Sequence, residues 1–145
     1  MVEFDEIAIR NEFMDCLREF FAEQYDLLKT EVEVTESESQ EPSFPCVIVS
    51  ILNPVSAERY SDSGGTYQFI DFSVNCECYS NGLDDFNLED SVIKLSQLTI
   101  TGILKKYKNF VVTRNNAVPF RADVKRRTVT LRGTYDNQNK IIYSN

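Results

Sequence analysis

The stretch that decides the fold is TYQFIDFSVNCECY, residues 66–79. Along it every second residue falls on the same side, which is the period of a β-strand. One side holds Thr66, Gln68, Ile70, Phe72, Val74, Cys76 and Cys78. The other side holds Tyr67, Phe69, Asp71, Ser73, Asn75, Glu77 and Tyr79. We therefore expect a strand of more than ordinary length, with its mainly apolar side against the core.

A helical pattern follows this strand after a break at residues 80–82 (SNG). It runs from about Asp85 to Lys108, and Asp84, Asp85 or Asn87 can cap its start. One apolar stripe at helical spacing contains Leu88, Val92, Leu95, Thr99, Ile103 and Tyr107. We expect this stripe to pack on the sheet, and Gly102 to allow the close approach.

The residues before the long strand indicate another helix and another strand. Residues 4–28 carry a broad apolar stripe and an acidic first turn, which is typical of a helix. Residues 46–52 (CVIVSIL) are apolar on both sides, as expected of a central strand, and Asn53-Pro54 is expected to end it. Between these elements, alternation around Val32 and Val34 allows a short exposed strand.

The residues after the second helix indicate two or three further strands. Residues 110–112 (FVV) predict a short strand, and the segment from Arg114 to Pro119 reads as a loop. Alternation returns over 123–135, and residues 140–143 suit a last edge strand or a docking tail. The predicted fold class is α+β: an antiparallel sheet of four or five strands with two helices packed on one face.

The composition suits one soluble domain over residues 1–145. Of the 145 residues, 42% are hydrophobic and 26% are charged, which are ordinary globular values. No apolar run is long enough to cross a membrane, and the acidic first twenty residues do not suit a signal peptide. We therefore expect a cytoplasmic chain without membrane partners. Within the domain, residues 30–43 form an acidic connection and residues 53–65 a long hairpin loop.

The net charge of −8 is unevenly distributed along the chain. Residues 1–44 hold 13 acidic and 3 basic side chains, whereas residues 105–132 hold 9 basic and 1 acidic. Two interpretations follow. The basic strand can lie over the acidic helix of its own subunit, or unlike patches can join neighbouring subunits head to tail, which closes into a ring or extends as a filament.

The residues give no positive support for catalysis or for a bound metal. The chain has no histidine, so it lacks the base of common nucleophilic triads and the usual zinc ligand. The four cysteines lie in helix or strand patterns, and we expect them to be buried and free. Acidic pairs at 84–85 and 89–90 are explained by a helix start. No cofactor is expected.

Interface residues are the remaining candidates. Two belong to the long loop, where Arg and Tyr are side chains favoured at binding hot spots, and six belong to the basic C-terminal segment. They are Arg59, Tyr60, Arg114, Arg121, Lys125, Arg126, Arg127 and Arg132. The stretch 125–127 (KRR) also suits nucleic acid, but its side chains alternate between the two faces of a strand and the whole chain is acidic. A solvated face or a protein interface is favoured.

The order of elements resembles the tail terminator, or tail-completion, proteins of tailed bacteriophages. The resemblance covers nearly the whole chain and is a pattern of layout. It rests on the N-terminal helix, FPCVIV (44–49), the long hairpin loop, VNCECY (74–79), the acid-capped helix 88–107 and RGTYD (132–136). The acidic connection is a departure from the family pattern.

The resemblance implies a ring, usually a hexamer, that caps the finished tail tube and joins it to the head connector. It implies a virion protein at the neck, assembled in the host cytoplasm, with no enzyme activity and no cofactor. The implied partners are further copies of the chain, the tail tube protein, and head connector or neck proteins. Two alternatives stay open: a head-closure or neck protein, and a nucleic-acid-binding domain that uses the basic strand.

Overall fold

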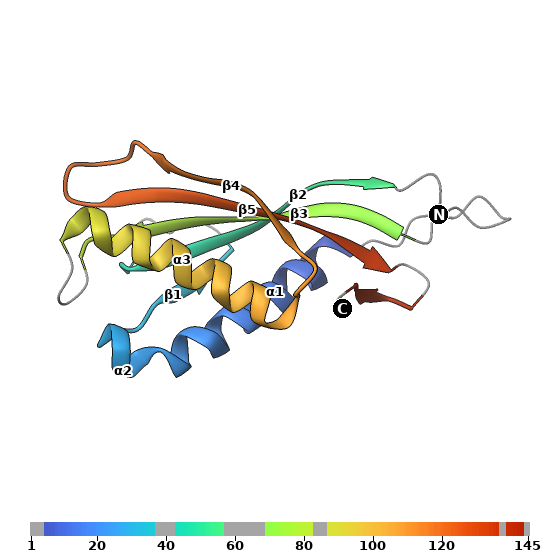
Figure 1. Cartoon of the computed structure of the whole chain (residues 1–145), viewed down its shortest axis with the longest axis horizontal. Coiled ribbons are helices and arrows are strands. Elements are labelled where there is room, and N and C mark those ends of the chain that lie inside the picture. Colours follow the sequence, from blue (N-terminus) through green and yellow to red (C-terminus); the bar gives the residue numbers. More distant parts are fainter. Residues whose placement is uncertain (1–4, 37–42, 57–68, 83–86, 137–138, 144–145) are drawn as a thin grey trace, which may run out of the picture.

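The fold is a single mixed sheet with helices on one face (Figure 1). The computed structural model describes residues 5–36, 43–56, 69–82, 87–136 and 139–143, without the side chains of 53–56. Along the chain the elements are α1 (Glu6–Glu23), α2 (Tyr25–Leu28), β1 (Glu33–Thr35), β2 (Cys46–Ser56), β3 (Phe69–Ser80), α3 (Leu88–Lys106), β4 (Val111–Val118), β5 (Lys125–Asp136) and β6 (Ile141–Ile142). The predicted α+β class, with two long helices on one face, is confirmed.

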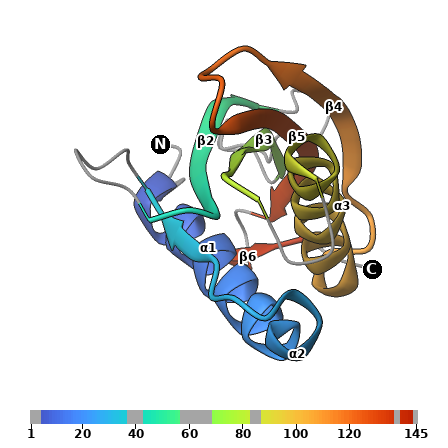
Figure 2. The same ribbon diagram turned by 90° about the vertical axis from the view of Figure 1, so that its left-hand side faces the viewer.

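The strand order in the sheet is β1-β2-β3-β5-β4, and β6 pairs with the end of β5. The pairs β2–β3, β3–β5, β4–β5 and β5–β6 are antiparallel, whereas β1 runs parallel to β2. The sheet is therefore mixed and has six strands, because the two short strands β1 and β6 join the expected antiparallel core. It curves strongly over the helices (Figure 2).

The alternation in residues 66–79 is confirmed over the part that lies in β3. Ile70, Phe72, Val74, Cys76 and Cys78 are all at most 2% exposed and face the helices. The residues between them, from Phe69 to Glu77, are half-buried on the opposite face. β5 repeats the pattern beside β3, so the two long strands bury one continuous apolar face.

The predicted helix over 4–28 is wrong at its C-terminal end, because the helix breaks at Gln24. α1 begins after Asp5, whose carboxylate caps it by accepting from the Ala8 N–H at 3.0 Å. At Gln24 the backbone leaves the helical path, and the single turn α2 follows. The change of direction leaves Leu28 buried at 2% exposure, while Leu27 is 56% exposed. The break thus goes together with the burial of Leu28 in the core.

The prediction that Asn53-Pro54 ends its strand is also wrong. β2 continues to Ser56, and its register against β3 shifts by one residue between Leu52 and Val55. A β-bulge of this kind leaves one residue outside the ladder, which is how a strand tolerates proline.

β1 was expected as an exposed strand, but Val34 is only 5% exposed and belongs to the core.

The segment 114–119 was predicted as a loop, and most of it is strand. β4 runs from Val111 to Val118 and pairs with β5 through a bulge between Val112 and Arg114. Residues 111–117 are all exposed, so the polar side chains at 114–116 remain in water while the backbone pairs. An edge strand of this kind lacks the apolar alternation on which the sequence prediction depended.

The core lies between the sheet and the helices α1 and α3. Phe13 of α1 packs its ring against Phe72, Tyr107 and Phe110, with centroids 6.1, 4.8 and 5.6 Å away. Gly102 does not face the sheet as expected. A Cβ at that position would lie 2.8 Å from the Phe20 ring, so this glycine allows α1 to approach α3.

All four cysteines are buried and free, as predicted. Cys76 and Cys78 face the helices, and the Cys78 sulfur lies 3.5 Å from the Thr99 hydroxyl. Burial raises the pKa of Cys78 to about 12 and the pKa of Cys76 well above its ordinary value. Both groups are therefore uncharged thiols at neutral pH, as packing in the core requires.

Candidate interface at the edges of the sheet

The sheet face turned away from the helices, here called the outer face, carries polar side chains. Asp71 accepts from Arg132 at 3.1 Å and from the Thr134 hydroxyl at 2.9 Å. Beside them, Thr130 donates to Asn75 at 2.8 Å. These bonds join β3 to β5 across the face and satisfy groups that no helix covers. The outer face is thus an ordered polar surface available to a partner.

Five of the predicted interface residues lie together at one edge of the sheet. We call this group the basic edge, and it consists of Arg114, Arg121, Lys125, Arg126 and Arg127. Arg114 lies on the edge strand β4, Arg121 on the connection to β5, and the other three at the start of β5. Arg132 lies six residues further along β5, in the ion pair with Asp71. It belongs to the outer face instead of the basic edge.

Aromatic rings bind two arginines of the basic edge. The Arg126 guanidinium lies over the rings of Tyr79 and Phe120, at 5.8 and 5.4 Å from their centroids. Arg121 lies over Phe44 and Phe120, at 5.6 and 5.2 Å. All four distances are within the range of cation–π attraction. We call these five residues the arginine–aromatic cluster.

Hydrogen bonds fix Arg126 within this cluster. One of its nitrogens donates to the Pro119 carbonyl at 2.8 Å, and another to the Tyr79 hydroxyl at 3.4 Å. Tyr79 in turn donates to Glu77 at 3.2 Å. Through Tyr79 the cluster joins a small apolar group that also contains Cys46, Ile48 and Val124. Tyr79 is only 1% exposed, so the surface that the cluster offers consists of Arg121, Phe120 and the half-buried Arg126 and Phe44. Arginine is among the side-chain types that dominate binding energy at interfaces.

The sequence did not indicate the aromatic members of this cluster. Tyr79 was assigned to one side of the long strand and Phe44 to the FPCVIV stretch. Phe120 lies between the predicted loop 114–119 and the alternation that begins at 123. A signal was present, since Phe120 stands between a proline and an arginine in a polar segment. It remains 42% exposed even inside the cluster. An exposed aromatic beside arginine is a recognised feature of interfaces.

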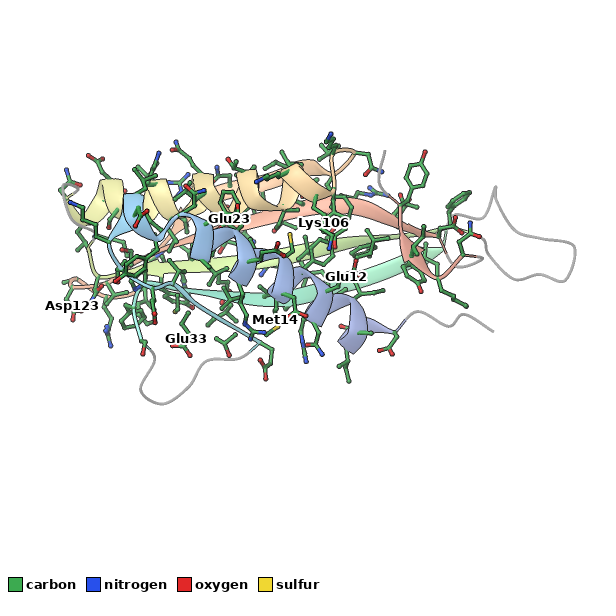
Figure 3. The ribbon with its side chains drawn as sticks, turned by 90° about the horizontal axis from the view of Figure 1, so that it is seen from below. Glu12, Met14, Glu23, Glu33, Lys106 and Asp123 are labelled. Atoms are coloured by element: carbon green, nitrogen blue, oxygen red, sulfur yellow. The ribbon has the colours of Figure 1, made fainter. Side chains whose placement is uncertain are left out.

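The opposite edge of the sheet is acidic. Glu31, Glu33 and Glu36 flank or belong to β1, and all three are exposed. α1 lies alongside, because Arg18 donates to the Val34 carbonyl at 2.8 Å, and it adds the exposed Asp15. We call these four acids the acidic edge. Figure 3 shows Glu33 on the outside of this edge.

The basic strand does not lie over the acidic helix of its own subunit, so that interpretation is wrong. Arg126 and Arg132 are on the outer face, while Arg127 bonds to Asn115 of β4 at 3.0 Å. Within the described residues, the one ion pair between the two oppositely charged segments joins Lys105 of α3 to Glu23 of α1 at 3.4 Å. The charges of the two sheet edges are thus not neutralised by each other.

Arg59 and Tyr60 lie outside the described residues, as do most of the hairpin loop 53–65 and the acidic run 37–42. Ser56 and Ile70 are paired across β2 and β3, so the strands that flank residues 57–68 end side by side. The loop therefore leaves from the end of the sheet opposite the arginine–aromatic cluster, where β5 begins.

The helical side offers two shallow grooves. One, of about 250 Å³, lies between α1 and α3 over Cys16 and Gly102, and the other, of about 370 Å³, lies between α1 and β1. In the first groove, Glu23 and Lys105 form an ion pair, and burial raises the pKa of the Cys16 thiol. Among the described residues there is no cluster of three potential metal ligands and no helix long and apolar enough to cross a membrane.

Comparison with known proteins gives no family for this chain, so any function must be argued from its own residues. A scan against protein-family models finds no matching family, and a search of curated proteins finds no matching sequence.

Proposed function

We propose that this chain is a structural protein of a tailed bacteriophage. In the proposal, copies of the chain form a ring, most simply a hexamer, that caps the completed tail tube and joins it to the head connector. Its partners are other copies of itself, the tail tube protein and the neck proteins, and its place is the top of the tail. The proposal includes no catalytic step and no cofactor.

The observation that carries the proposal is the opposite charge of the two sheet edges. β1 and β4 are the outermost strands, four strand spacings apart or about 19 Å along the sheet. A patch that complements a different patch on the same molecule favours a heterologous contact, which closes into a ring when the rotation permits. The layout resemblance to tail terminator proteins points to the same kind of assembly.

The outer face and the arginine–aromatic cluster support a role in joining. Arg121 and Phe120 of the cluster stay exposed after the helices have packed, and the side chains of the cluster are already held by cation–π contacts and hydrogen bonds. A preorganised polar surface loses little side-chain freedom when it binds. These surfaces are suited to the tail tube on one side of a ring and to the connector on the other.

The head-closure alternative predicts the same surfaces and stays a second candidate. The two virion roles differ in where the protein lies in the particle.

Nucleic-acid binding is less well supported. Arg114, Arg121, Arg127 and Arg132 each have a side-chain partner within the subunit, and Arg126 is enclosed by the cluster. Free cations arranged for phosphate contacts are what such binding needs.

The test has two measurements on the purified protein. Light scattering should give a closed oligomer whose mass is a multiple of 16.7 kDa, roughly 100 kDa for six copies, and high salt should weaken it. Electron microscopy of gold-labelled protein mixed with assembled tails and with tail-free heads should place the label at the upper end of the tails.

The outcomes separate the candidates. Label only on the head vertex would support the head-closure alternative. A chain that stays monomeric with and without tails, and labels neither structure, would exclude both virion roles. A monomer in solution that becomes a ring at the tail end would still agree with the proposal.

A further inference from the structure

The edge strand β4 has the features of a strand that pairs with another chain. It is the last strand of the sheet, its residues 111–117 are exposed, and among the described residues it pairs with β5 only. Two of its exposed side chains are large and apolar, Val111 at 61% and Val112 at 37%. Natural proteins protect long edge strands with lysines, prolines or inward charges. β4 contains no lysine and no proline, and Arg114 is its one charge.

The opposite edge of the sheet leaves most of β2 without a neighbour. β1 covers only Cys46–Ile48, and within the described residues no strand pairs with the outer side of β2 from Val49 to Ser56. That free length is comparable with β4. The exposed Leu52, at 39%, lies in it. Each subunit therefore has one open edge on each side of its sheet.

We propose that β4 of one copy pairs antiparallel with the free edge of β2 in the next copy, so that the sheets of a ring are continuous. This inference rests on the self-association in the proposed function. The strand directions agree with it, because β2, β3, β5 and β4 alternate in direction. A rotation that relates one copy to the next about an axis parallel to the strands does not change the strand directions. β4 of one copy therefore lies antiparallel to β2 of the next copy.

The two faces and the position of β1 restrict the register. On β2 the outer-face residues include Ser50 and Leu52, and on β4 they include Asn116 and Val118, as their partners on β3 and β5 show. For the sheets of two copies to be continuous, residues on the outer face of β4 must lie opposite residues on the outer face of β2. With β1 occupying Cys46–Ile48, the register that pairs the longest stretch of both strands places Val118 opposite Ser50 and Asn116 opposite Leu52.

The same register brings the charged edges together. The connection that follows β4 carries Arg121, and it would pass over β1 of the next copy, where Glu33 and Glu36 are exposed. A two-fold pairing of β4 with itself would instead bring two copies of Arg114 close to one another, and like charges across a strand pair are unfavourable. The occupant is therefore a second copy, joined head to tail.

Cysteine cross-linking tests this contact. Paired residues on antiparallel strands have the Cα separation that a disulfide needs, and the native thiols are buried. The variant Asn116→Cys with Leu52→Cys, oxidised as the assembled oligomer, should give a ladder of covalent multimers in non-reducing electrophoresis. In one chain the two positions are on opposite edges of the sheet, so they cannot link to each other.

The controls are the two single variants and Asn115→Cys with Leu52→Cys, which places the new thiol on the other face of β4. All three should remain monomeric after denaturation. Covalent dimers from Asn116→Cys alone would show β4 pairing with itself and overturn the proposal. An intact oligomer without a ladder would overturn this contact but leave the proposed ring. A monomer under every condition, tails included, would exclude both.

Discussion

Gly133 of β5 lies directly beneath the ring of Phe110, so close that a Cβ at position 133 would overlap the ring. The absent side chain makes space for an aromatic residue that also contacts Phe13 and Phe72 at 5.6 and 5.7 Å. A glycine usually weakens a strand, because it has no side chain to pack. Here the ring supplies that packing from the residue just before β4.

Gly133→Ala should therefore lower stability although alanine suits strands at least as well as glycine. The added methyl group must displace Phe110, and overpacking of this kind costs about 1 to 3 kcal/mol. Urea unfolding followed by circular dichroism measures the change. Adding Phe110→Leu should recover part of the loss, and a purely additive double variant would show that the two positions do not interact.

The buried thiols should react slowly in the native protein. Cys76 and Cys78 are 0% exposed, and their raised pKa values keep them protonated near neutral pH. Thiolate is the reactive form, so both access and charge oppose modification. A chromogenic disulfide reagent should label fewer than one thiol quickly in buffer and all four in denaturant. Two rapidly labelled thiols would contradict the register of β3.

Stability should fall as the pH rises past 10. The pKa of Tyr107 is raised above its ordinary value of 10.0 by burial and by its bond to Glu12 at 2.8 Å. Above pH 10 the unfolded tyrosine loses its proton while the folded one keeps it, so unfolding is favoured. The contribution of Tyr107 to the free energy of unfolding is complete below pH 10. It decreases as the pH rises toward the pKa of Tyr107 in the folded protein. The raised thiol pKa values act in the same direction from about 9.0.

Tyr107→Phe tests this assignment. The variant should lose about 1 kcal/mol near neutral pH, because the Glu12 hydrogen bond is gone. Its stability should then decline less steeply above pH 10 than that of the unchanged protein. Equal slopes in chemical unfolding at several pH values would mean that other groups cause the alkaline decline.

Reversing charge on the basic edge should weaken self-association. Arg126→Glu with Arg127→Glu turns two cations of that edge into anions, which the acidic edge of a neighbour repels. Sedimentation velocity at low and high salt should show a smaller oligomer at the same protein concentration. Lys94→Glu with Lys108→Glu makes the same change in net charge outside both edges and should leave the oligomer nearly intact.

Folding must be checked in this experiment, since Arg126 also holds Tyr79 and Phe120. Circular dichroism of the double variant should match the unchanged protein. An unaltered oligomer from a folded double variant would show that the basic edge does not form the contact.

Replacing residues 57–63 by a short Gly-Ser link should cost little stability but prevent tail completion. The paired positions Ser56 and Ile70 show that the flanking strands end side by side, so a shorter connection can close. Arg59 and Tyr60 are then absent. Complementation of a null phage, read by infectivity and by electron microscopy of tails, measures the result. Particles with tails of normal length would assign the joining surface elsewhere.

The sequence predicted the parts of the fold that a buried face determines. The β3 and β5 alternation and the α3 stripe are confirmed, because burial on one side forces apolar residues into a period of two or of 3.6. β4 was missed for the opposite reason. Backbone pairing and hydrogen bonds such as that from Arg127 to Asn115 hold it, and its residues 111–117 are exposed instead of packed in the core.

For the candidate interface, the sequence predicted individual charged residues but not how they are arranged in space. That Arg121 and Arg126 share the ring of Phe120 depends on the turn between β4 and β5. Arg132 shares the outer face with Arg126, and its separation from the basic edge depends on its position six residues further along β5. The acidic edge and the basic edge lie on opposite sides of the sheet because β1 pairs in parallel with β2. Such a non-local pairing cannot be read from a short stretch of sequence.

The pairing of β3 with β5 over twelve positions has a mechanical consequence. Tension applied along these strands from opposite ends loads every rung of the ladder at once, so the strands can slide apart only if all the rungs break together. Tension applied across them opens the rungs one after another. A joint built from such subunits resists pulling most strongly when its strands are parallel to the load, which for the proposed ring is the axis of the tail.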